Sequence, residues 1–188
     1  MKIDLEGQVA IVTGAGRGLG RAHAIALAER GAKVIVNDLA TEGSVSENAE
    51  SVVNEIANNG GEALANGANV ADFDQVQAMI TQAMDAWGRI DILVNNAGIL
   101  RDKTFLKMTP EDMRMVVDVH LMGSMYCAKA VWEIMREQAY GRVVFTSSSS
   151  GLYGNFGQTN YGAAKMAMVG MMNTCLLYTS PSPRDVEE

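Results

Sequence analysis

A tyrosine and a lysine stand four residues apart in the last third of the sequence, at Tyr161 and Lys165. If this stretch is helical, residues at that spacing share one face. A free tyrosine has a pKa of about 10, and a neighbouring ammonium favours the phenolate. Such a tyrosine could donate or accept a proton at a carbonyl or an alcohol near neutral pH. Ser148, 13 residues before Tyr161, could hydrogen-bond the same substrate oxygen. A structural interpretation also stays open, in which Tyr161 packs in the core and Lys165 extends to solvent.

A second chemically informative stretch lies near the N-terminus, where Val9–Gly20 reads V-A-I-V-T-G-A-G-R-G-L-G. A β-rich apolar run leads into Gly14, Gly18 and Gly20 and then into an alanine-rich segment, which predicts strand, tight turn and helix. The N–H groups and the dipole at such a helix start favour an anion, and glycine leaves room for its approach. Asp38 ends the next apolar run, 18 residues after Gly20. An acid at about this distance binds the adenosine ribose in dinucleotide-binding folds.

These residues need a scaffold in which strands and helices alternate. Strands are predicted over 9–13, 33–37, 62–65, 92–95 and 142–146, and helices over 18–30, 47–58 and 73–87, from 109–110 onward and from about 159 onward. Thr109 would cap the fourth helix, with Pro110 in its first turn. The serine run 147–150 is predicted to be a loop. Alternation of this kind predicts an α/β fold, a doubly wound parallel sheet of the Rossmann type. The sequence ends soon after the fifth strand and the Tyr/Lys helix.

Composition narrows the class of protein. A chain of 188 residues with 48% hydrophobic and 20% charged residues is typical of one globular domain. The net charge of −7 argues against nucleic acid or an anionic membrane as a partner. The 2 cysteines lack metal-ligand spacing and suit a reducing cytosol, so we expect no metal and a cytoplasmic location. No apolar leader and no run of 18 apolar residues is present, so neither a signal peptide nor a membrane span is expected.

Four motifs taken together resemble the short-chain dehydrogenases/reductases: T-G-x-x-x-G-x-G at 13–20, N-N-A-G at 95–98, Ser148, and Y-x-x-x-K at 161–165. The resemblance covers residues 5 to about 174. The runs V-I-V-N-D-L, D-V-H-L-M-G-S and S-G-L-Y-G-N-F-G-Q-T-N-Y-G-A-A-K are most similar to the 3-hydroxyacyl-CoA dehydrogenase domain of peroxisomal multifunctional enzymes and bacterial relatives. This implies an NAD-dependent oxidoreductase that interconverts a secondary alcohol and a ketone. A 3-hydroxyacyl thioester is the suggested substrate, and the parent enzyme is expected to be a homo-oligomer.

The resemblance implies a role for each matching residue. Ser148 would orient the substrate oxygen, Tyr161 would be the acid/base, and Lys165 would bind the nicotinamide ribose and favour the Tyr161 phenolate. The implied cofactor-binding residues are Thr13, Gly14, Arg17, Gly18, Gly20, Asp38, Asp72, Asn95, Tyr161 and Lys165.

Within that set, residues 13–20 would cradle the pyrophosphate, Asp72 would contact the adenine, and Asn95 would lie below the cofactor and stabilise the central strand. Asp38 would repel a 2′-phosphate and so favour NAD, whereas Arg17 favours NADP.

One position departs from the commonest family pattern. Many members carry asparagine in N-L-x-G on the long helix, where this sequence has H-L-M-G at 120–123. Histidine can also hydrogen-bond a water or a backbone group, so His120 is a catalytic candidate as a relay member. A histidine that only packs between helices is the alternative.

The C-terminal stretch differs from the rest of the chain. Pro181 and Pro183 forbid a helix, and the sequence from 175 resembles translated read-through of a sequencing adapter. We therefore predict an incomplete dehydrogenase domain over 1–174 and a non-native tail over 175–188. A short native disordered terminus is the alternative.

The family fold normally continues with two further strands and a helical substrate flap. Without them we expect an exposed fifth strand and weak or no activity from the 188 residues alone. The functional rivals are an NADP-dependent 3-oxoacyl reductase, a non-catalytic nucleotide-binding protein and an inactive fragment.

Overall fold

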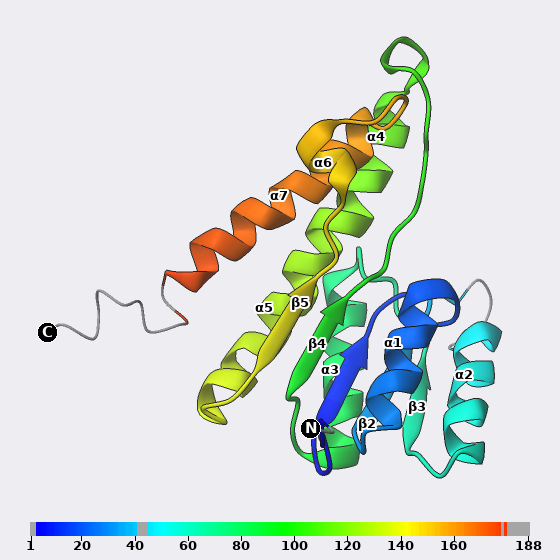
Figure 1. Cartoon of the computed structure of the whole chain (residues 1–188), viewed down its shortest axis with the longest axis vertical. Coiled ribbons are helices and arrows are strands. Elements are labelled where there is room, and N and C mark those ends of the chain that lie inside the picture. Colours follow the sequence, from blue (N-terminus) through cyan, green and yellow to red (C-terminus); the bar gives the residue numbers. More distant parts are fainter. Residues whose placement is uncertain (1–2, 41–44, 178, 180–188) are drawn as a thin grey trace, which may run out of the picture.

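The computed structural model describes residues 3–40, 45–177 and 179. In these ranges one parallel sheet has the strand order β3-β2-β1-β4-β5 (Figure 1). The strands are β1 (Val9–Val12), β2 (Lys33–Asn37), β3 (Ala63–Asn66), β4 (Ile92–Asn95) and β5 (Arg142–Phe145). The chain runs outward from β1 in both directions, which confirms the predicted doubly wound α/β class. Ligands of such sheets bind at the carboxyl ends of the strands, where the order reverses.

Helices cover both faces of this sheet. They are α1 (Gly18–Ala28), α2 (Glu47–Asn58), α3 (Phe73–Trp87), α4 (Pro110–Val117), α5 (Gly123–Glu137), α6 (Ser149–Tyr153) and α7 (Thr159–Leu176), with a 3₁₀ turn at Phe105–Lys107. Alternate strand residues face opposite sides. Val12 and Val34 pack with α1 and α2, while Ile11 and Leu93 pack with α3 and α5. The two buried clusters hold the strand ends that carry the site in fixed register.

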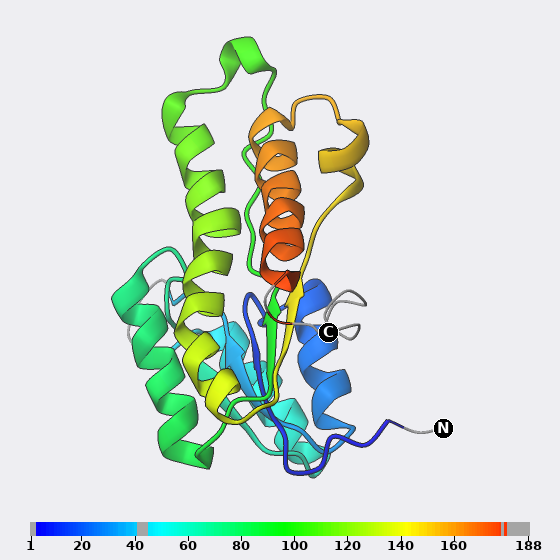
Figure 2. The same ribbon diagram turned by 90° about the vertical axis from the view of Figure 1, so that its left-hand side faces the viewer.

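The long helix between β4 and β5 has three parts. As predicted, Thr109 caps α4 and Pro110 is its first residue; Asp112 completes a capping box. A π-helical segment, Asp118–Met122, then joins α4 to α5. Figure 2 shows this long helix running beside α7, which also contacts α4 and the π-helical segment. Such segments are rare and frequently lie at functional sites.

The structure corrects several predicted boundaries. The strand at 9–13 ends at 12, the strand at 62–65 lies at 63–66, the strand at 142–146 ends at 145, and the first helix ends at 28. The predicted serine loop is wrong in part, because Ser149 begins α6. Ser148 caps that helix by accepting a hydrogen bond from the Ser150 N–H at 3.2 Å. Serine is a strong N-cap, which explains why a serine run starts a helix here.

The predicted tail is described only in small part. Helix α7 continues through Leu176, two residues past the predicted domain end at 174. Residues 178 and 180–188 lie outside the described residues.

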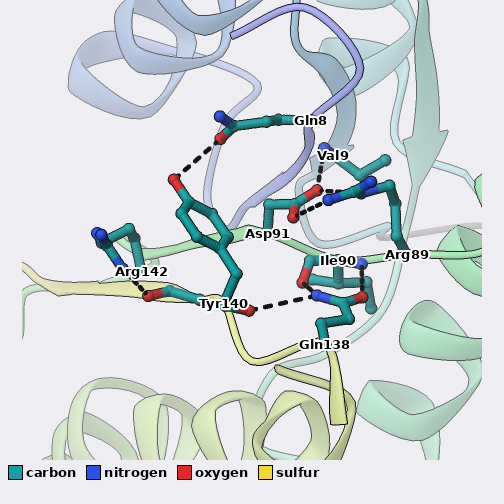
Figure 3. Close-up of polar contacts among 9 residues, drawn as sticks. Gln8, Val9, Arg89, Ile90, Asp91, Gln138, Tyr140 and Arg142 are labelled. Atoms are coloured by element: carbon teal, nitrogen blue, oxygen red, sulfur yellow. Dashed lines mark hydrogen bonds and ion pairs between the residues drawn. The ribbon is translucent and has the colours of Figure 1, made fainter. Parts of the chain in front are cut away.

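A buried carboxylate locks the amino ends of the central strands, opposite the expected site (Figure 3). Asp91, just before β4, is 0% exposed. Its Oδ2 accepts the Val9 N–H at 2.9 Å and the Arg89 Nε–H at 2.8 Å, and its Oδ1 accepts from Arg89 at 2.8 Å. The pairing satisfies a charge that would otherwise be costly to bury. It also fixes the start of β4 against the start of β1.

The turn before β5 joins the same network (Figure 3). The Gln138 amide accepts from the Ile90 N–H at 3.0 Å and donates to the Ile90 carbonyl at 2.7 Å. The Tyr140 hydroxyl donates to Gln8 at 3.4 Å, and the Arg142 guanidinium lies 4.7 Å from the centre of the Tyr140 ring. β1, β4 and β5 are therefore connected by side chains at this end.

β5 is an edge of the described sheet, with β4 as its described neighbour. Val144, in the middle of the strand, is 48% exposed. This agrees with the expectation of an exposed fifth strand. Among the described helices, none is long and apolar enough to cross a membrane.

Candidate active site

A cleft of about 620 Å³ opens at the carboxyl ends of β1, β2 and β4. Its lining includes Gly14, Arg17, Gly20, Asp38, Asn69, Val70, Asn96, Ala97, Gly98, Ile99 and Val119. The volume lies within the range of cofactor and small-molecule sites. Arg17 brings a positive charge to the cleft and Asp38 a negative one.

The glycines between β1 and α1 allow close backbone approach. A Cβ at Gly14 would lie 2.8 Å from Ala97 Cα, and Gly14 and Gly18 have φ of +61° and +58°. A Cβ at Gly20 would overlap the Gly14 carbonyl. Gly16, which was not among the predicted site residues, leaves no room for a Cβ beside the Asp38 carboxylate. Its place in the G-A-G run was the available signal.

The start of α1 is open to an anion. Arg17 occupies the N-cap position and makes no side-chain cap bond, and the first turn of α1 has no acidic residue. The N–H groups of such a turn, together with the helix dipole, attract phosphate. This geometry agrees with a pyrophosphate cradle over residues 13–20.

Thr13 and Asn96 fasten β1 to β4 directly beneath the cleft. The Thr13 hydroxyl accepts the Asn96 and Ala97 N–H groups, each at 3.0 Å. The Asn96 amide donates to the Thr13 carbonyl at 2.9 Å and to the Gly14 carbonyl at 3.1 Å. Thr13 thus holds the cradle in place through its side chain. Asn96 was missed as a site residue, although N-N-A-G contained it.

Asp38 stands just after β2 and lines the cleft. The Ser46 hydroxyl donates to Asp38 Oδ2 at 3.4 Å. The carboxylate is only half-buried, so it keeps oxygen lone pairs for a bound hydroxyl.

Asp72 is used differently from what was expected. It caps α3, accepting from the Asp74 N–H at 3.0 Å and the Gln75 N–H at 3.2 Å, and from the Gln75 side chain at 2.9 Å. These hydrogen bonds, those from Gln75 above all, hold the pKa of Asp72 below its usual value. Asn69 and Val70 line the cleft, and Asp72 is not in its lining. The structure therefore does not bring Asp72 to the cleft, and the adenine contact stays a prediction.

Asn95 ends β4 and is 4% exposed. Neither its Oδ1 nor its Nδ2 has a hydrogen-bond partner among the described residues. Buried amides normally satisfy this capacity, so Asn95 holds an unused donor and acceptor at the strand end.

Tyr161 and Lys165 lie on one face of α7. The Lys165 ammonium is 5.5 Å from the centre of the Tyr161 ring and donates to the Thr146 carbonyl at 2.5 Å. Lys165 is 3% exposed, and burial lowers its pKa to about 8. The alternative in which Lys165 extends to solvent is therefore wrong.

Ser148 lies at the start of α6, which packs against α7. Its hydroxyl accepts a hydrogen bond from Ser150 N–H. Because a hydroxyl has one donor and two lone pairs, this cap leaves the Ser148 proton for a substrate oxygen.

His120 joins the cleft wall to Tyr161. Its Nε2 lies 3.0 Å from the Ile99 N and 2.8 Å from the Ile99 O, and its ring makes a T-shaped contact with that of Tyr161, with centres 5.1 Å apart. Burial lowers the pKa of His120 to about 4, with the Lys165 charge adding to the effect. The imidazole is therefore neutral at pH 7.

Fold and site together define a class of protein. A parallel sheet carries a glycine cradle at its switch point, and a phenol beside an ammonium stands behind the cleft wall. This arrangement is that of a nucleotide-dependent α/β oxidoreductase.

Comparison with known proteins gives the family. The family model described as short chain dehydrogenase matches residues 8–181, so this chain belongs to the short-chain dehydrogenases. It is 52% identical to peroxisomal multifunctional enzyme type 2 of Drosophila melanogaster, over 92% of this chain and 29% of that enzyme. It is 48% identical to a 3-oxoacyl-(acyl-carrier-protein) reductase of Synechocystis sp., over 90% of this chain and 67% of that protein.

A solved structure agrees with these relatives. The crystal structure of a short chain dehydrogenase from Mycobacterium avium matches with a TM-score of 0.88 and 41% identity, over 93% of this chain and 64% of that one. The chain therefore spans less than a third of the fly enzyme and under two thirds of the mycobacterial one.

Proposed function

We propose that this chain carries the cofactor half of an NAD-dependent dehydrogenase that interconverts a secondary alcohol and a ketone. Membership of the short-chain dehydrogenases makes it part of an oxidoreductase acting on CH–OH groups. The single observation that carries the proposal is the Lys165 ammonium held over the Tyr161 ring. A 3-hydroxyacyl thioester is the proposed substrate, supported by the likeness to the fly multifunctional enzyme.

The residues present fit a dinucleotide. Gly14, Gly16 and Gly20 leave no space for side chains, and the first turn of α1 is uncapped by side chains. The loop from Thr13 to Gly20 would hold the pyrophosphate, Asp38 the adenosine ribose, and Asn95 and Lys165 the nicotinamide half. When bound, the nicotinamide supplies the acceptor for the hydride that leaves the carbinol carbon.

Residues of this chain would transfer the proton of the substrate hydroxyl. Tyr161 Oη would take the proton of the substrate hydroxyl as the carbon–oxygen double bond forms, and would return it in the reverse direction. The Lys165 ammonium, 5.5 Å from the centre of the Tyr161 ring, would place a positive charge beside the reacting phenol and the nicotinamide ribose. The Ser148 hydroxyl would donate to the substrate oxygen and hold it in line with Tyr161.

Replacing Tyr161 tests whether the chain is a catalyst. Turnover of a 3-hydroxyacyl-CoA with NAD would be followed by NADH absorbance, and cofactor binding by NADH fluorescence. We expect Tyr161→Phe to abolish turnover and to leave NADH affinity within about twofold, because only the proton carrier is lost. Tyr126→Phe, on α5, is the matched control. Unchanged turnover in Tyr161→Phe would overturn the role of Tyr161 as the proton carrier. NADH binding without turnover in the unaltered chain would favour a non-catalytic nucleotide-binding protein or an inactive fragment.

Cofactor choice has a second candidate. An NADP-dependent 3-oxoacyl reductase is supported by Arg17 in the cleft wall and by the Synechocystis relative. We favour NAD, because the Asp38 carboxylate would repel a 2′-phosphate in the same cleft. NADH and NADPH titrations should show that NADH binds at least about tenfold more tightly than NADPH. Asp38→Ala should reduce this difference in affinity. Asp85→Ala, on the exposed side of α3, is the charge-matched control. Tighter NADPH binding by the unaltered chain would favour the reductase.

Location and assembly follow as further proposals. A cytoplasmic site stays our prediction, while the fly relative is named as peroxisomal. A homo-oligomer formed through α4, α5 and α7 also stays a prediction. Exposed methionines on these helices, Met115, Met125 and Met166, support it. Light scattering of the purified protein would give the state of assembly.

A further inference from the structure

His120 makes two sets of contacts, one through Nε2 with Ile99 and one through its ring with Tyr161. Nε2 lies within hydrogen-bond distance of both backbone groups of Ile99, at 3.0 Å and 2.8 Å. The His120 and Tyr161 rings meet in a T-shaped arrangement at an interplanar angle of 89°, a favourable aromatic geometry. One side chain thus bridges the segment that follows β4 and the helix that carries the phenol.

Gly98 is fitted to the same imidazole. A Cβ at this position would overlap His120 Cε1 and lie 3.0 Å from Nδ1 and 3.1 Å from Nε2. All three of its nearest atoms belong to His120, and Gly98 does not have a positive φ. A side chain here would therefore be opposed by the imidazole and not by the backbone conformation.

Three further hydrogen bonds hold this arrangement. The Ser124 hydroxyl donates to the His120 carbonyl at 2.6 Å, within the wider turn of the π-helical segment. Asn160 accepts the Tyr161 N–H at 2.8 Å and donates to the Arg101 carbonyl at 3.3 Å. The segment 98–101 is thus tied to Tyr161 from both its start and its end.

We propose that His120 is a positioning residue, which fixes the orientation of the Tyr161 ring while Gly98 provides the space for its imidazole. This rests on the proposed function of Tyr161. A proton relay through His120 would need both ring nitrogens to exchange protons, whereas Nε2 faces the N–H and the carbonyl of Ile99, accepts from one or donates to the other according to its tautomer, and meets no group there that titrates. The effect of His120 on the reaction is therefore exerted through the Tyr161 ring.

A double-mutant cycle tests this coupling. Gly98→Ala should lower kcat roughly 2- to 12-fold, the range of an aromatic pair contact. In a His120→Ser background, which removes the ring, Gly98→Ala should have no further effect. Gly170→Ala on α7, where a Cβ meets nothing within 4 Å, is the matched glycine control. Additive losses in the double variant would overturn the proposal.

A conservative replacement separates positioning from proton relay. His120→Phe keeps an aromatic ring beside Tyr161 but cannot carry a proton, so kcat should stay within about threefold and the pH profile should keep its shape. His23→Phe, at an exposed position of α1, is the matched control. Equal losses in His120→Phe and His120→Ser, or a displaced pH profile, would show that the imidazole acts chemically and would overturn the proposal.

A spectroscopic readout keeps the test independent of turnover. With ¹³C-labelled tyrosine, the Tyr161 ring resonances should shift in Gly98→Ala and in His120→Ser, and should stay unchanged in Gly170→Ala. Unshifted resonances in both variants would overturn the proposal. If Tyr161→Phe keeps full turnover, the proposed function fails. If it loses turnover while the His120 variants keep kcat and Tyr161 resonances, only the positioning role fails.

Discussion

The buried ammonium of Lys165 should make the stability of the fold depend on alkaline pH. Lys165 is 3% exposed, and burial lowers its pKa from 10.5 to about 8. Below about pH 8 it is charged in both states, and the folded state bears the cost of burying that charge. Between about pH 8 and 10.5 the unfolded chain keeps the proton and the folded chain releases it, so the free energy of unfolding rises with pH. A shift of about 2.5 units at about 1.4 kcal/mol per unit corresponds to a rise of about 3 kcal/mol.

Lys165→Met isolates this contribution. Urea unfolding of the unaltered chain and the variant at pH 7.5 to 10.5 gives the difference in free energy of unfolding at each pH. Burial also raises the pKa of the Cys127 thiol to about 12, which lowers stability from about pH 9 upward. Because both proteins contain Cys127, its effect cancels in the difference. The unaltered chain should gain about 3 kcal/mol relative to Lys165→Met across the range.

The control is Lys129→Met, which removes an exposed lysine from α5 and should give a pH-independent difference. An equally flat difference for Lys165→Met would refute the reasoning. It would mean that the ammonium stays charged in the folded state and that its environment is better solvated than its burial indicates.

Three further predictions follow from single contacts. Thr13→Val should lower the free energy of unfolding by about 1–3 kcal/mol in urea titrations, because the Asn96 and Ala97 N–H groups lose their acceptor; unchanged stability would contradict this. Cys127 is buried with its pKa raised to about 12, so a disulfide reagent should modify it only as fast as the protein unfolds, and rapid modification in native buffer would refute its burial. The pKa of His120 is lowered to about 4, so the unfolded chain takes up its proton first as pH falls from about 6.5, and stability should drop by about 3 kcal/mol between pH 6.5 and 4. His120→Phe should not show this drop in the free energy of unfolding. Urea unfolding at pH 6.5 and pH 4 checks this, and an equal drop in the variant and in the unaltered chain would contradict it.

Much of the fold could be predicted because hydrophobic period and turn residues agree along the chain. The strand at 33–37 and the helices at 47–58 and 73–87 have the predicted bounds. Several strand ends differ from the prediction, since the last strand residue depends on pairing with a neighbour distant in sequence. The serine run was misassigned because its residues suit a loop and an N-cap equally well.

The sequence could predict which residues belong to the site, but not which contacts they make. Spacing placed Tyr161 and Lys165 on one face, yet the burial of Lys165 depends on the Thr146 carbonyl, which comes from another element. The role of Asp72 as a cap is local, since its partners are Asp74 and Gln75 at the start of a helix that was predicted, whereas the contacts of Thr13 with Asn96 and Ala97 are tertiary. No periodicity distinguishes a side chain that faces a cleft from one that turns back to its own backbone.

The charged network around Asp91 has a consequence for how motion is distributed along the strands. Charged and amide side chains join β1, β4 and β5 at one end, whereas at the other end the neutral hydrogen bonds of Thr13 and Asn96 join β1 to β4, glycines follow β1, and Asn95 has no hydrogen-bond partner among the described residues. Amide hydrogens of Val9 and Asp91 should therefore exchange with solvent deuterium more slowly than those of Asn96 and Ala97. The amino ends of the strands would then stay fixed while the cleft at their carboxyl ends adjusts to different ligands, and the strand register would not change.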